Sequence, residues 1–469
     1  MVSTDVLVLG GGPAGCAAGR LLALWGHRVT LVTKPLSTTS HLAESLPPST
    51  GKLFDILGIR ERIDGAGFVR STGNTVWWGT DQARVEPFVA GGLGWQVTAH
   101  QLDPLLQQAA REAGVAIEYR RAKEAGSDRQ GAFVLDCTGR SGVLARARGW
   151  RQHEPAHRTV ALIGRWLCHA GLDVPDQTHT LIESYDNGWA WSVPASAHHR
   201  YVAVMVDPKV SDLTHDAMAR DVYRAEVAKT RQFARLLTAA QMADGPFGWD
   251  ASMYSSTQYA DERCLLVGDA ASFIDPLSSV GVKKALASGW LAAIAVHTAL
   301  VRPAMQRVAF NFFAAREAEI YASFRRLTAT FLADAAPGHR HAFWSDRTEP
   351  PEDDAAARVS TALTRIRQAD AIDLRRGAAV RVEDRPAVSG TEIVLEQRLV
   401  SDAHDAGVRY LFDVDLLALA EILPWHTQVP DAFEAYNTRV GPVALPEFVT
   451  ALAAAVADGW LEWPPCATR

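Results

Sequence analysis

Val6-Leu7-Val8-Leu9-Gly10-Gly11-Gly12-Pro13-Ala14-Gly15 is the stretch that decides the expected fold of this 469-residue chain. Its four apolar residues are typical of a buried strand, its glycines of a turn, and the apolar spacing that continues to Leu24 of a helix. A second apolar run, Val29-Thr30-Leu31-Val32, follows that helix. A strand, a glycine turn, a helix and a strand in this order are the context in which a GxGxxG match indicates dinucleotide binding.

The three motif glycines each have a separate physical task. Gly10 permits the tight turn, Gly12 lets the backbone approach a pyrophosphate, and Gly15 lets the helix pack closely on the strand. The first turn of the helix supplies free amides and a favourable dipole for phosphate. The predicted phosphate contacts are therefore Gly10, Gly12, Pro13, Ala14 and Gly15.

The end of the second strand departs from the usual pattern. An acidic residue commonly holds the ribose hydroxyls there, whereas this chain has Thr33 followed by Lys34. A hydroxyl or main-chain contact from these two residues could replace the carboxylate, or Thr33 could merely end the strand. Both residues are candidate cofactor contacts.

Two later segments extend the nucleotide site. Phe133-Val134-Leu135-Asp136-Cys137-Thr138-Gly139 is a strand with a polar end, which we interpret as structural support beneath the dinucleotide. The strand 264–267 ends at Gly268-Asp269, where the glycine lets the backbone meet a cofactor and the carboxylate can accept from a ribityl hydroxyl. Pro276 fixes a turn, and Gly281-Val282 opens a helix whose free amides can face the electron-rich edge of a flavin. Together these motifs predict FAD.

With these motifs the chain resembles the flavin-dependent halogenases, especially the phenol- and pyrrole-type branch, and their flavin hydroxylase relatives. Within the first segment of the likeness, Glu44 and Ser45 are predicted flavin contacts. The likeness is carried by four segments: Leu42-Ala43-Glu44-Ser45-Leu46-Pro47-Pro48-Ser49, Asn187-Gly188-Trp189-Ala190-Trp191-Ser192-Val193-Pro194, Asp275-Pro276-Leu277-Ser278-Ser279-Val280-Gly281-Val282, and the helical stretch 311–321.

The resemblance implies an α/β fold of the glutathione-reductase type. A Rossmann-like FAD-binding domain, residues 1–154 and 251–345, is expected to carry an inserted substrate β-sheet domain at 155–250. Strands are expected at 160–167, 189–193 and 201–206, with helices at 217–237 and 306–335. A charged, proline-containing linker and helix at 346–384 would lead to a small C-terminal unit at 385–469, which resembles a mostly helical, winged-helix-like module.

Trp189 and Trp191 are two residues apart on an expected strand, so both side chains should lie on one face of the sheet. We interpret them as sheet core that also shapes the passage between flavin and substrate. In the halogenases this segment is thought to keep the substrate away from the flavin. Both residues are candidates for lining the substrate passage.

The stretch 67–79 differs from the halogenases at the decisive position. Halogenases of this branch carry a lysine in a pattern like K-x-G-x-x-F-x-W-G, and this chain has Ser71 there. A neutral hydroxyl cannot form the cationic donor, or the chloramine, that activates hypohalous acid, and the permanently charged Arg70 is a poor replacement. Ser71 is a third candidate for the substrate passage.

Without the lysine, the resemblance implies a FAD-dependent monooxygenase. Such an enzyme uses O2 to hydroxylate an electron-rich aromatic group through a flavin C4a-hydroperoxide, and a tryptophan residue of a polypeptide during tryptophylquinone biogenesis is the particular case we favour. A halogenase with a displaced lysine and a non-oxygenating flavin binder are the alternatives. The residue patterns place no catalytic base.

The reductant and the remaining partners are less well marked. There is no second GxGxxG, and Ala99-His100-Gln101-Leu102-Asp103 lacks the arginine common in self-reducing hydroxylases, so either NAD(P)H or a partner flavin reductase is possible. The net charge of -6 gives no reason to expect nucleic acid. We expect no membrane span, no metal site among five scattered cysteines, and a cytoplasmic location. The C-terminal unit would either pack on the main domain or dock a polypeptide substrate.

Overall fold

The computed structural model describes residues 4–37, 42–122, 133–155, 158–209, 211, 218–348 and 355–463. The chain divides into two compact units, Met1–Glu349 and Pro350–Arg469. Residues 349–354 of the expected linker lie outside the described residues.

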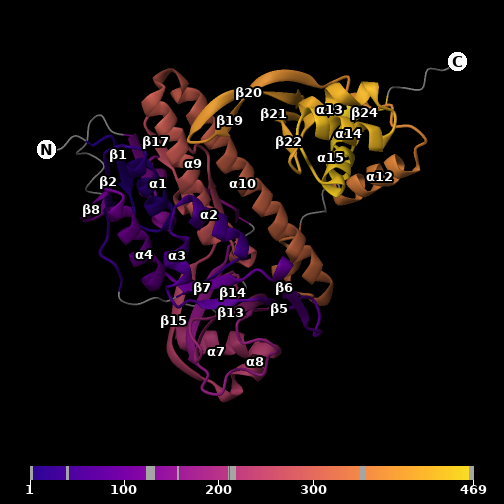
Figure 1. The fold of residues 1–469 in the computed structure, drawn as a ribbon. Helices are drawn as coiled ribbons and strands as arrows, with labels where there is room; N and C mark the ends of the chain where they lie inside the picture. Colours follow the sequence, from indigo (N-terminus) through magenta and orange to yellow (C-terminus); the bar gives the residue numbers. More distant parts are fainter. Residues whose placement is uncertain are drawn as a thin grey trace. The chain divides into compact units, whose positions relative to one another are not determined.

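The predicted nucleotide-binding strands form one parallel sheet at the core of the first unit (Figure 1). Its strands pair in the order β17-β9-β1-β2-β8, and β1, β2 and β17 are almost wholly buried because helices cover the sheet. The expected strand-turn-helix-strand unit is confirmed as β1, α1 (Pro13–Leu24) and β2. The strand bounds are β1 (Val6–Leu9), β2 (Val29–Thr33), β8 (Ala116–Tyr119), β9 (Phe133–Asp136) and β17 (Cys264–Leu266).

Three long helices accompany this sheet. The expected helix at 306–335 is confirmed as α10 (Gln306–Ala335), while α9 (Gly281–Val301) packs against both α1 and α10, and α4 (Ala99–Glu112) packs against α1. By length and composition α9 could cross a membrane, although no membrane span was expected from the sequence. Two thirds of its apolar window are buried inside the protein, so its apolar composition is explained by the core.

A seven-stranded sheet forms the second layer of this unit, in the order β15-β11-β14-β13-β12-β5-β6. The three strands expected here are confirmed as β11, β13 and β14. The sheet is not limited to 155–250, because β5 pairs in parallel with β12 and brings β6 with it. The bounds are β5 (Gly73–Trp77), β6 (Arg84–Pro87), β11 (Val160–Leu167), β12 (Thr180–Tyr185), β13 (Gly188–Pro194), β14 (His199–Val206) and β15 (Gln241–Asp250).

The expected helix at 217–237 is broken into two. Helix α7 (Ala219–Lys229) ends before Thr230, and α8 (Gln232–Leu236) begins two residues later. The buried Glu183 carboxylate of β12 accepts hydrogen bonds from the main-chain N–H groups of Arg231, Gln232 and Phe233 at 2.6–3.0 Å. The break therefore leaves main-chain N–H groups at the start of α8 free to donate hydrogen bonds to the Glu183 carboxylate.

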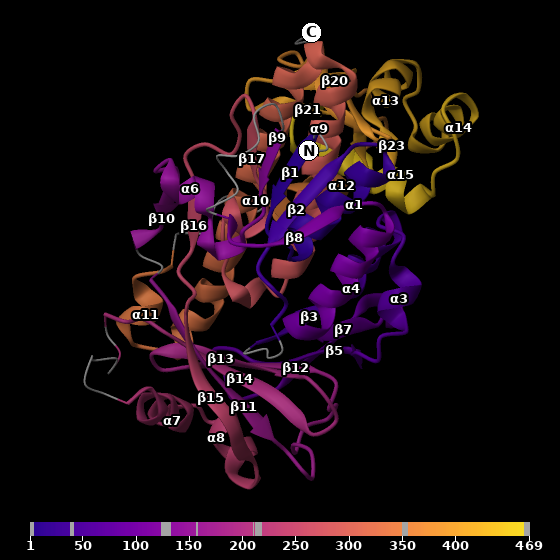
Figure 2. The ribbon, with the colours of Figure 1, turned by 90° about the vertical axis from the view of Figure 1, so that its left-hand side faces the viewer.

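The two faces of the seven-stranded sheet bury different partners. Helices α7 and α8 cover the outer face (Figure 2), where Tyr223 and Phe233 pack against strand residues. The inner face carries Trp189 and Trp191 and packs against the end of α10 and Trp344. Both tryptophans lie in β13, as expected for sheet core. A small sheet of β3 (Ala43–Leu46), β7 (Gly94–Thr98) and β4 (Val69–Ser71) completes the unit, with shorter elements α2 (Gly51–Ile56), α3 (Arg60–Asp64), α6 (Val143–Ala147), α11 (Ala342–Ser345), β10 (Arg151–His153) and β16 (Tyr254–Ser256).

The C-terminal unit has its own core and begins earlier than the expected residue 385. Helix α12 (Ala355–Gln368) packs against α15, and Ile366 is buried in the same cluster as Leu399 and Phe448. The residues 355–384 are therefore part of this unit rather than a separate linker. Its other elements are β18 (Arg375–Arg376), β19 (Arg381–Ser389), β20 (Glu392–Ser401), β21 (His404–Val408), β22 (Tyr410–Leu411), β23 (Val414–Asp415), α13 (Leu416–Ile422), α14 (Val429–Arg439), α15 (Leu445–Ala457) and β24 (Leu461–Glu462).

Candidate functional site

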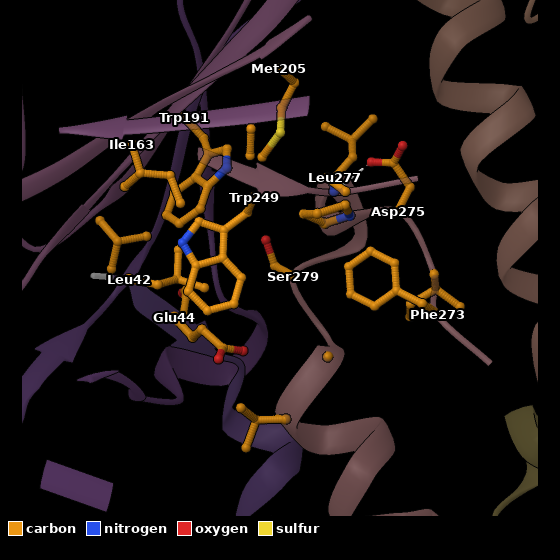
Figure 3. Close-up of a pocket in the computed structure, with 18 of the residues that line it drawn as sticks. Leu42, Glu44, Ile163, Trp191, Met205, Trp249, Phe273, Asp275, Leu277 and Ser279 are labelled. Carbon is orange, nitrogen blue, oxygen red and sulfur yellow. Dashed lines mark hydrogen bonds between the residues drawn. The ribbon is translucent and has the colours of Figure 1, made fainter. Parts of the chain in front are cut away.

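One pocket of about 470 Å³ lies between the parallel sheet and the inner face of the seven-stranded sheet. Its walls come from the start of α1, strand β3, the inner face of β11–β15 and the segment 269–285. One half is polar and one half is aromatic and aliphatic. Figure 3 shows Glu44 on the side of α9, and Ile163, Trp191 and Met205 on the side of the sheet.

Half of the predicted cofactor contacts line the polar half of the pocket. The residues of the prediction that line the pocket are Pro13, Glu44, Ser45, Asp269, Pro276, Gly281 and Val282. The glycine turn lies behind them and is tight: a Cβ on Gly10 would lie 2.1 Å from the Cys137 oxygen, and Gly10 has a φ of +107°. A Cβ on Gly15 would lie 1.9 Å from the Gly10 oxygen, as the close packing of helix and strand requires.

The remaining predicted contacts are placed less directly. Gly12 is the N-cap of α1, and Ala14 and Gly268 are packed behind the pocket, where a Cβ on Gly268 would lie 3.1 Å from the Ala14 Cβ. Thr33 is the last residue of β2, and Lys34 follows it with an exposed side chain. Neither Thr33 nor Lys34 is among the residues that line the pocket.

The two helix starts at this end fit FAD. The N-caps of α1 and α9, Gly12 and Val280, have no side-chain hydrogen bond to the first turn, so those amides are available to a ligand. A Cβ on Gly12 would have no atom within 4 Å, which leaves space for a close approach. The α1 amides would hold the pyrophosphate, Asp269 a ribityl hydroxyl, and the α9 amides the polar edge of the flavin ring.

Lys284, near the start of α9, is buried beneath this site and supports it. Its Nζ donates to the main-chain oxygens of Gly268 at 3.1 Å and Ser272 at 2.6 Å, and lies 3.6 Å from Asp269 Oδ1. Lys283 instead extends to Ser49 Oγ at 2.8 Å. Lys284 therefore holds the Gly268-Asp269 turn and places a positive charge beside the Asp269 carboxylate.

Acidic side chains in and near the polar half of the pocket affect one another's pKa values. Burial, then the negative charges of Asp269 and Asp103, raises the pKa of Glu44 to about 7. Burial likewise raises the pKa of Asp103 to about 7. Burial also raises the pKa of Asp269, against the opposing effect of Lys284. Near neutral pH, Glu44 can therefore hold or release a proton beside the flavin position.

The aromatic half contains Trp189 and Trp191 together with residues that the sequence did not single out. Trp249 of β15 lines the pocket, and the Arg140 guanidinium lies 5.4 Å from the Trp249 ring and 4.8 Å from the Phe273 ring. Arg140 directly follows the Asp136-to-Gly139 motif, so its position near the cofactor was detectable in the sequence. Trp249 stood among 14 tryptophans with no motif around it.

Ser71 does not reach the pocket. It is the last residue of β4, is fully buried, and donates its hydroxyl to the main-chain oxygen of Gly73 at 3.1 Å. It is not among the lining residues, in contrast to Trp189 and Trp191. Among the described residues that line the pocket there is also no lysine and no histidine. In the described part of the chain, no group of three or more His, Cys, Asp or Glu side chains is placed to hold a metal ion.

Comparison with known proteins places this geometry in a family. A family model described as an FAD-binding domain matches residues 3–136, and a family model described as tryptophan halogenase matches residues 93–410. The chain belongs to the tryptophan halogenase family. It is thus an FAD-dependent flavoprotein of the halogenase family, an oxidoreductase.

Individual relatives are more distant. The chain is 28% identical to a tryptophan 2-halogenase of Chondromyces crocatus over 338 residues, which are 66% of this chain and 64% of that protein. It is 27% identical to the flavin-dependent halogenase armH3 of Armillaria mellea over 69% of this chain and 73% of that protein. The match therefore spans less than two thirds of the tryptophan 2-halogenase.

Two solved structures share the fold over nearly the whole chain. The flavin-dependent halogenase CmlS matches 98% of this chain and 96% of its own length, with a TM-score of 0.81 and 20% identity. The peptidyl tryptophan dihydroxylase QhpG, described as essential for tryptophylquinone cofactor biogenesis, matches 94% of this chain and 100% of its own length, with a TM-score of 0.68 and 22% identity. Both likenesses therefore extend into the C-terminal unit, and the halogenase shares that unit as fully as the dihydroxylase does.

Proposed function

We propose that the protein is an FAD-dependent monooxygenase that hydroxylates an electron-rich aromatic ring. The observation that carries the proposal is the pocket wall: no lysine lines it, and the position where the resemblance places the halogenase lysine is Ser71, buried with its hydroxyl bonded to Gly73. An amine that could carry hypohalous acid is therefore lacking among the described residues of the pocket.

FAD, when bound and reduced, would activate O2, and O2 would supply the oxygen atom that is transferred to the ring. The residues of this chain bind the cofactor and orient the substrate ring. The helix starts and Asp269 hold the cofactor, while Ile163, Trp191 and Met205 surround the ring and exclude water. Exclusion of water favours transfer to the substrate over loss of the oxidising equivalent.

Hydroxylation of an aromatic ring also releases a proton, and the pocket offers two candidate acceptors. Asp275 lines the pocket, and its Oδ1 accepts from the main-chain N–H of Leu277 at 2.9 Å, which fixes the direction of the carboxylate. Burial raises the pKa of Asp275. Glu44, with a pKa of about 7, lies on the flavin side. We assign Asp275 to the substrate side and Glu44 to the flavin side.

A tryptophan residue within a polypeptide is the substrate we favour. The support is the shared fold with a peptidyl tryptophan dihydroxylase together with the missing pocket lysine. The C-terminal unit does not separate this substrate from others, because the halogenase CmlS matches 98% of this chain. Reduced flavin would come from NAD(P)H or from a partner flavin reductase.

The test is intact-mass analysis of aromatic substrates and of tryptophan-containing polypeptides after incubation with the FAD-loaded protein, a flavin reductase, NADH and air. A gain of one or two oxygen atoms is expected. Halogenation is the second candidate, favoured by the halogenase relatives, and the same incubation with excess bromide decides it. A brominated product would replace the proposed hydroxylation, whereas an unchanged product mass in bromide supports it.

A further inference from the structure

The indole nitrogen of Trp191 differs from those of Trp78 and Trp344, two other buried tryptophans of the same aromatic cluster. Trp78 Nε1 donates to the Phe331 oxygen at 2.6 Å, and Trp344 Nε1 donates to the Tyr185 oxygen at 3.0 Å. Trp191 belongs to the same cluster and is only 9% exposed, yet its Nε1 is buried and has no hydrogen-bond partner among the described residues. Its N–H group is therefore a buried donor that has lost water without gaining a protein acceptor.

The unpaired nitrogen belongs to a side chain that lines the pocket. In Figure 3 the nitrogen edge of the Trp191 ring faces the interior of the pocket, toward the side where Met205 and Leu277 lie. The surrounding wall of Ile163, Ile182 and Met205 is apolar and provides no acceptor oxygen from its side chains. A buried N–H without an acceptor is unfavourable, and a ligand that brings an acceptor to this point removes that cost.

We propose that Trp191 Nε1–H is a substrate-binding group that donates a hydrogen bond to an acceptor oxygen on the aromatic substrate. The inference rests on the proposed function, since it takes the aromatic half of the pocket as the substrate site. Trp191 then does more than separate substrate from flavin: it selects for oxygen at one position beside the ring.

The proposal restricts the substrate class. A bare indole or pyrrole ring offers its N–H as a donor and has no oxygen to accept from Trp191. The acceptor must therefore be either a hydroxyl or phenolate oxygen on the ring, or a main-chain carbonyl next to an aromatic residue in a polypeptide. Both sources present the same chemistry to Trp191, and ligand pairs can tell them apart.

The experiment measures equilibrium binding to the oxidised, FAD-loaded protein without any reductant, by calorimetry or by perturbation of the flavin spectrum. One ligand pair is p-cresol and p-xylene, which differ by the ring oxygen. The other pair is N-acetyltryptophanamide and 3-methylindole, which differ by the main-chain carbonyls. Each ligand is titrated against the parent protein, Trp191→Phe and Trp189→Phe. The Phe variants keep an aromatic ring and remove an indole N–H.

The expected result is that Trp191→Phe weakens the oxygen-bearing member of one pair by about three- to tenfold, as for one hydrogen bond, and its partner less than twofold. A selective loss of affinity for p-cresol would identify a phenolic oxygen as the acceptor. A selective loss of affinity for N-acetyltryptophanamide would identify a peptide carbonyl as the acceptor. Trp189→Phe, on the same strand face, should weaken both members of a pair equally. Equal losses within both pairs for Trp191→Phe, or the same selectivity from Trp189→Phe, would overturn the proposal.

Two further measurements keep the test decisive. FAD content and the temperature of FAD release identify a variant that fails to fold, in which case Trp191→Leu takes its place. In the parent protein alone, at least one oxygen-bearing ligand must bind more tightly than its partner, and absence of any preference also refutes the role. Because no turnover is needed, these results are independent of whether the product proves to be hydroxylated or halogenated.

Discussion

Replacing Gly289 by alanine should separate the two helices whose starts form the flavin end of the pocket. A Cβ on Gly289 of α9 would lie 2.4 Å from the Ala14 oxygen and 3.1 Å from the Ala17 Cβ, both on α1. The main chain of α1 cannot give way as a flexible side chain would, so the helices must move apart by several tenths of an ångström.

The magnitude follows from two opposing effects. Overpacking of a core contact costs about 1–3 kcal/mol, and the better helix propensity of alanine returns up to about 1 kcal/mol. We therefore expect Gly289→Ala to lose up to about 2 kcal/mol of unfolding free energy. Because Pro13 and Gly281 begin these helices and both line the pocket, FAD affinity should fall as well.

The assay measures the temperature at which FAD fluorescence appears on heating. This temperature reports unfolding of the flavin-binding unit rather than of the C-terminal unit. The matched control is Gly19→Ala in α1, where a Cβ would lie 3.7 Å from Val115 Cγ2, an ordinary contact. The control should release FAD at the parent temperature or slightly above it. If Gly289→Ala releases FAD at the same temperature as the control, the two helices α1 and α9 do not approach as closely as described.

Three further outcomes are expected. Asp269→Ala removes a charged acceptor and should raise the dissociation constant of FAD by about tenfold or more, as for a lost charged hydrogen bond; an unchanged constant in a fluorescence titration would contradict the assigned contact. Burial and nearby carboxylates raise the pKa of Glu44 from 4.5 to about 7, so the folded protein holds a proton that the unfolded chain releases, and this group's contribution to stability falls as pH rises from about 4.5 through 7. Urea unfolding of the flavin-free protein should therefore show the parent losing stability relative to Glu44→Gln between pH 5 and pH 8, and parallel profiles would argue against a raised pKa. A chain that ends at residue 349 should stay soluble and keep FAD, whereas one that ends at residue 384 should aggregate because Ile366 loses its core; equal solubility of the two truncations would place the unit boundary elsewhere.

The sequence was most informative where structure is local. The glycine turn, the strand before it and the helix after it follow from neighbouring residues alone, because φ, helix packing and amide direction are set within one βαβ unit. The expected strand at 160–167 and helix at 306–335 were confirmed to the residue. The exception to such local control is the helix at 217–237, which is broken where the buried carboxylate of Glu183, distant in sequence, accepts hydrogen bonds from the main-chain N–H groups.

What the sequence by itself determined is the position of the predicted cofactor end of the site, because the predicted contacts are main-chain amides and a carboxylate fixed by short motifs. Only the tertiary structure decided which side chains form the substrate end. Trp249 reaches the pocket through pairing of β15 with β11, and Ser71 turns away from it because its hydroxyl bonds within its own turn. The raised pKa of Glu44 and the unpaired nitrogen of Trp191 likewise depend on burial by residues far apart in the chain, and burial is a property that no local pattern contains.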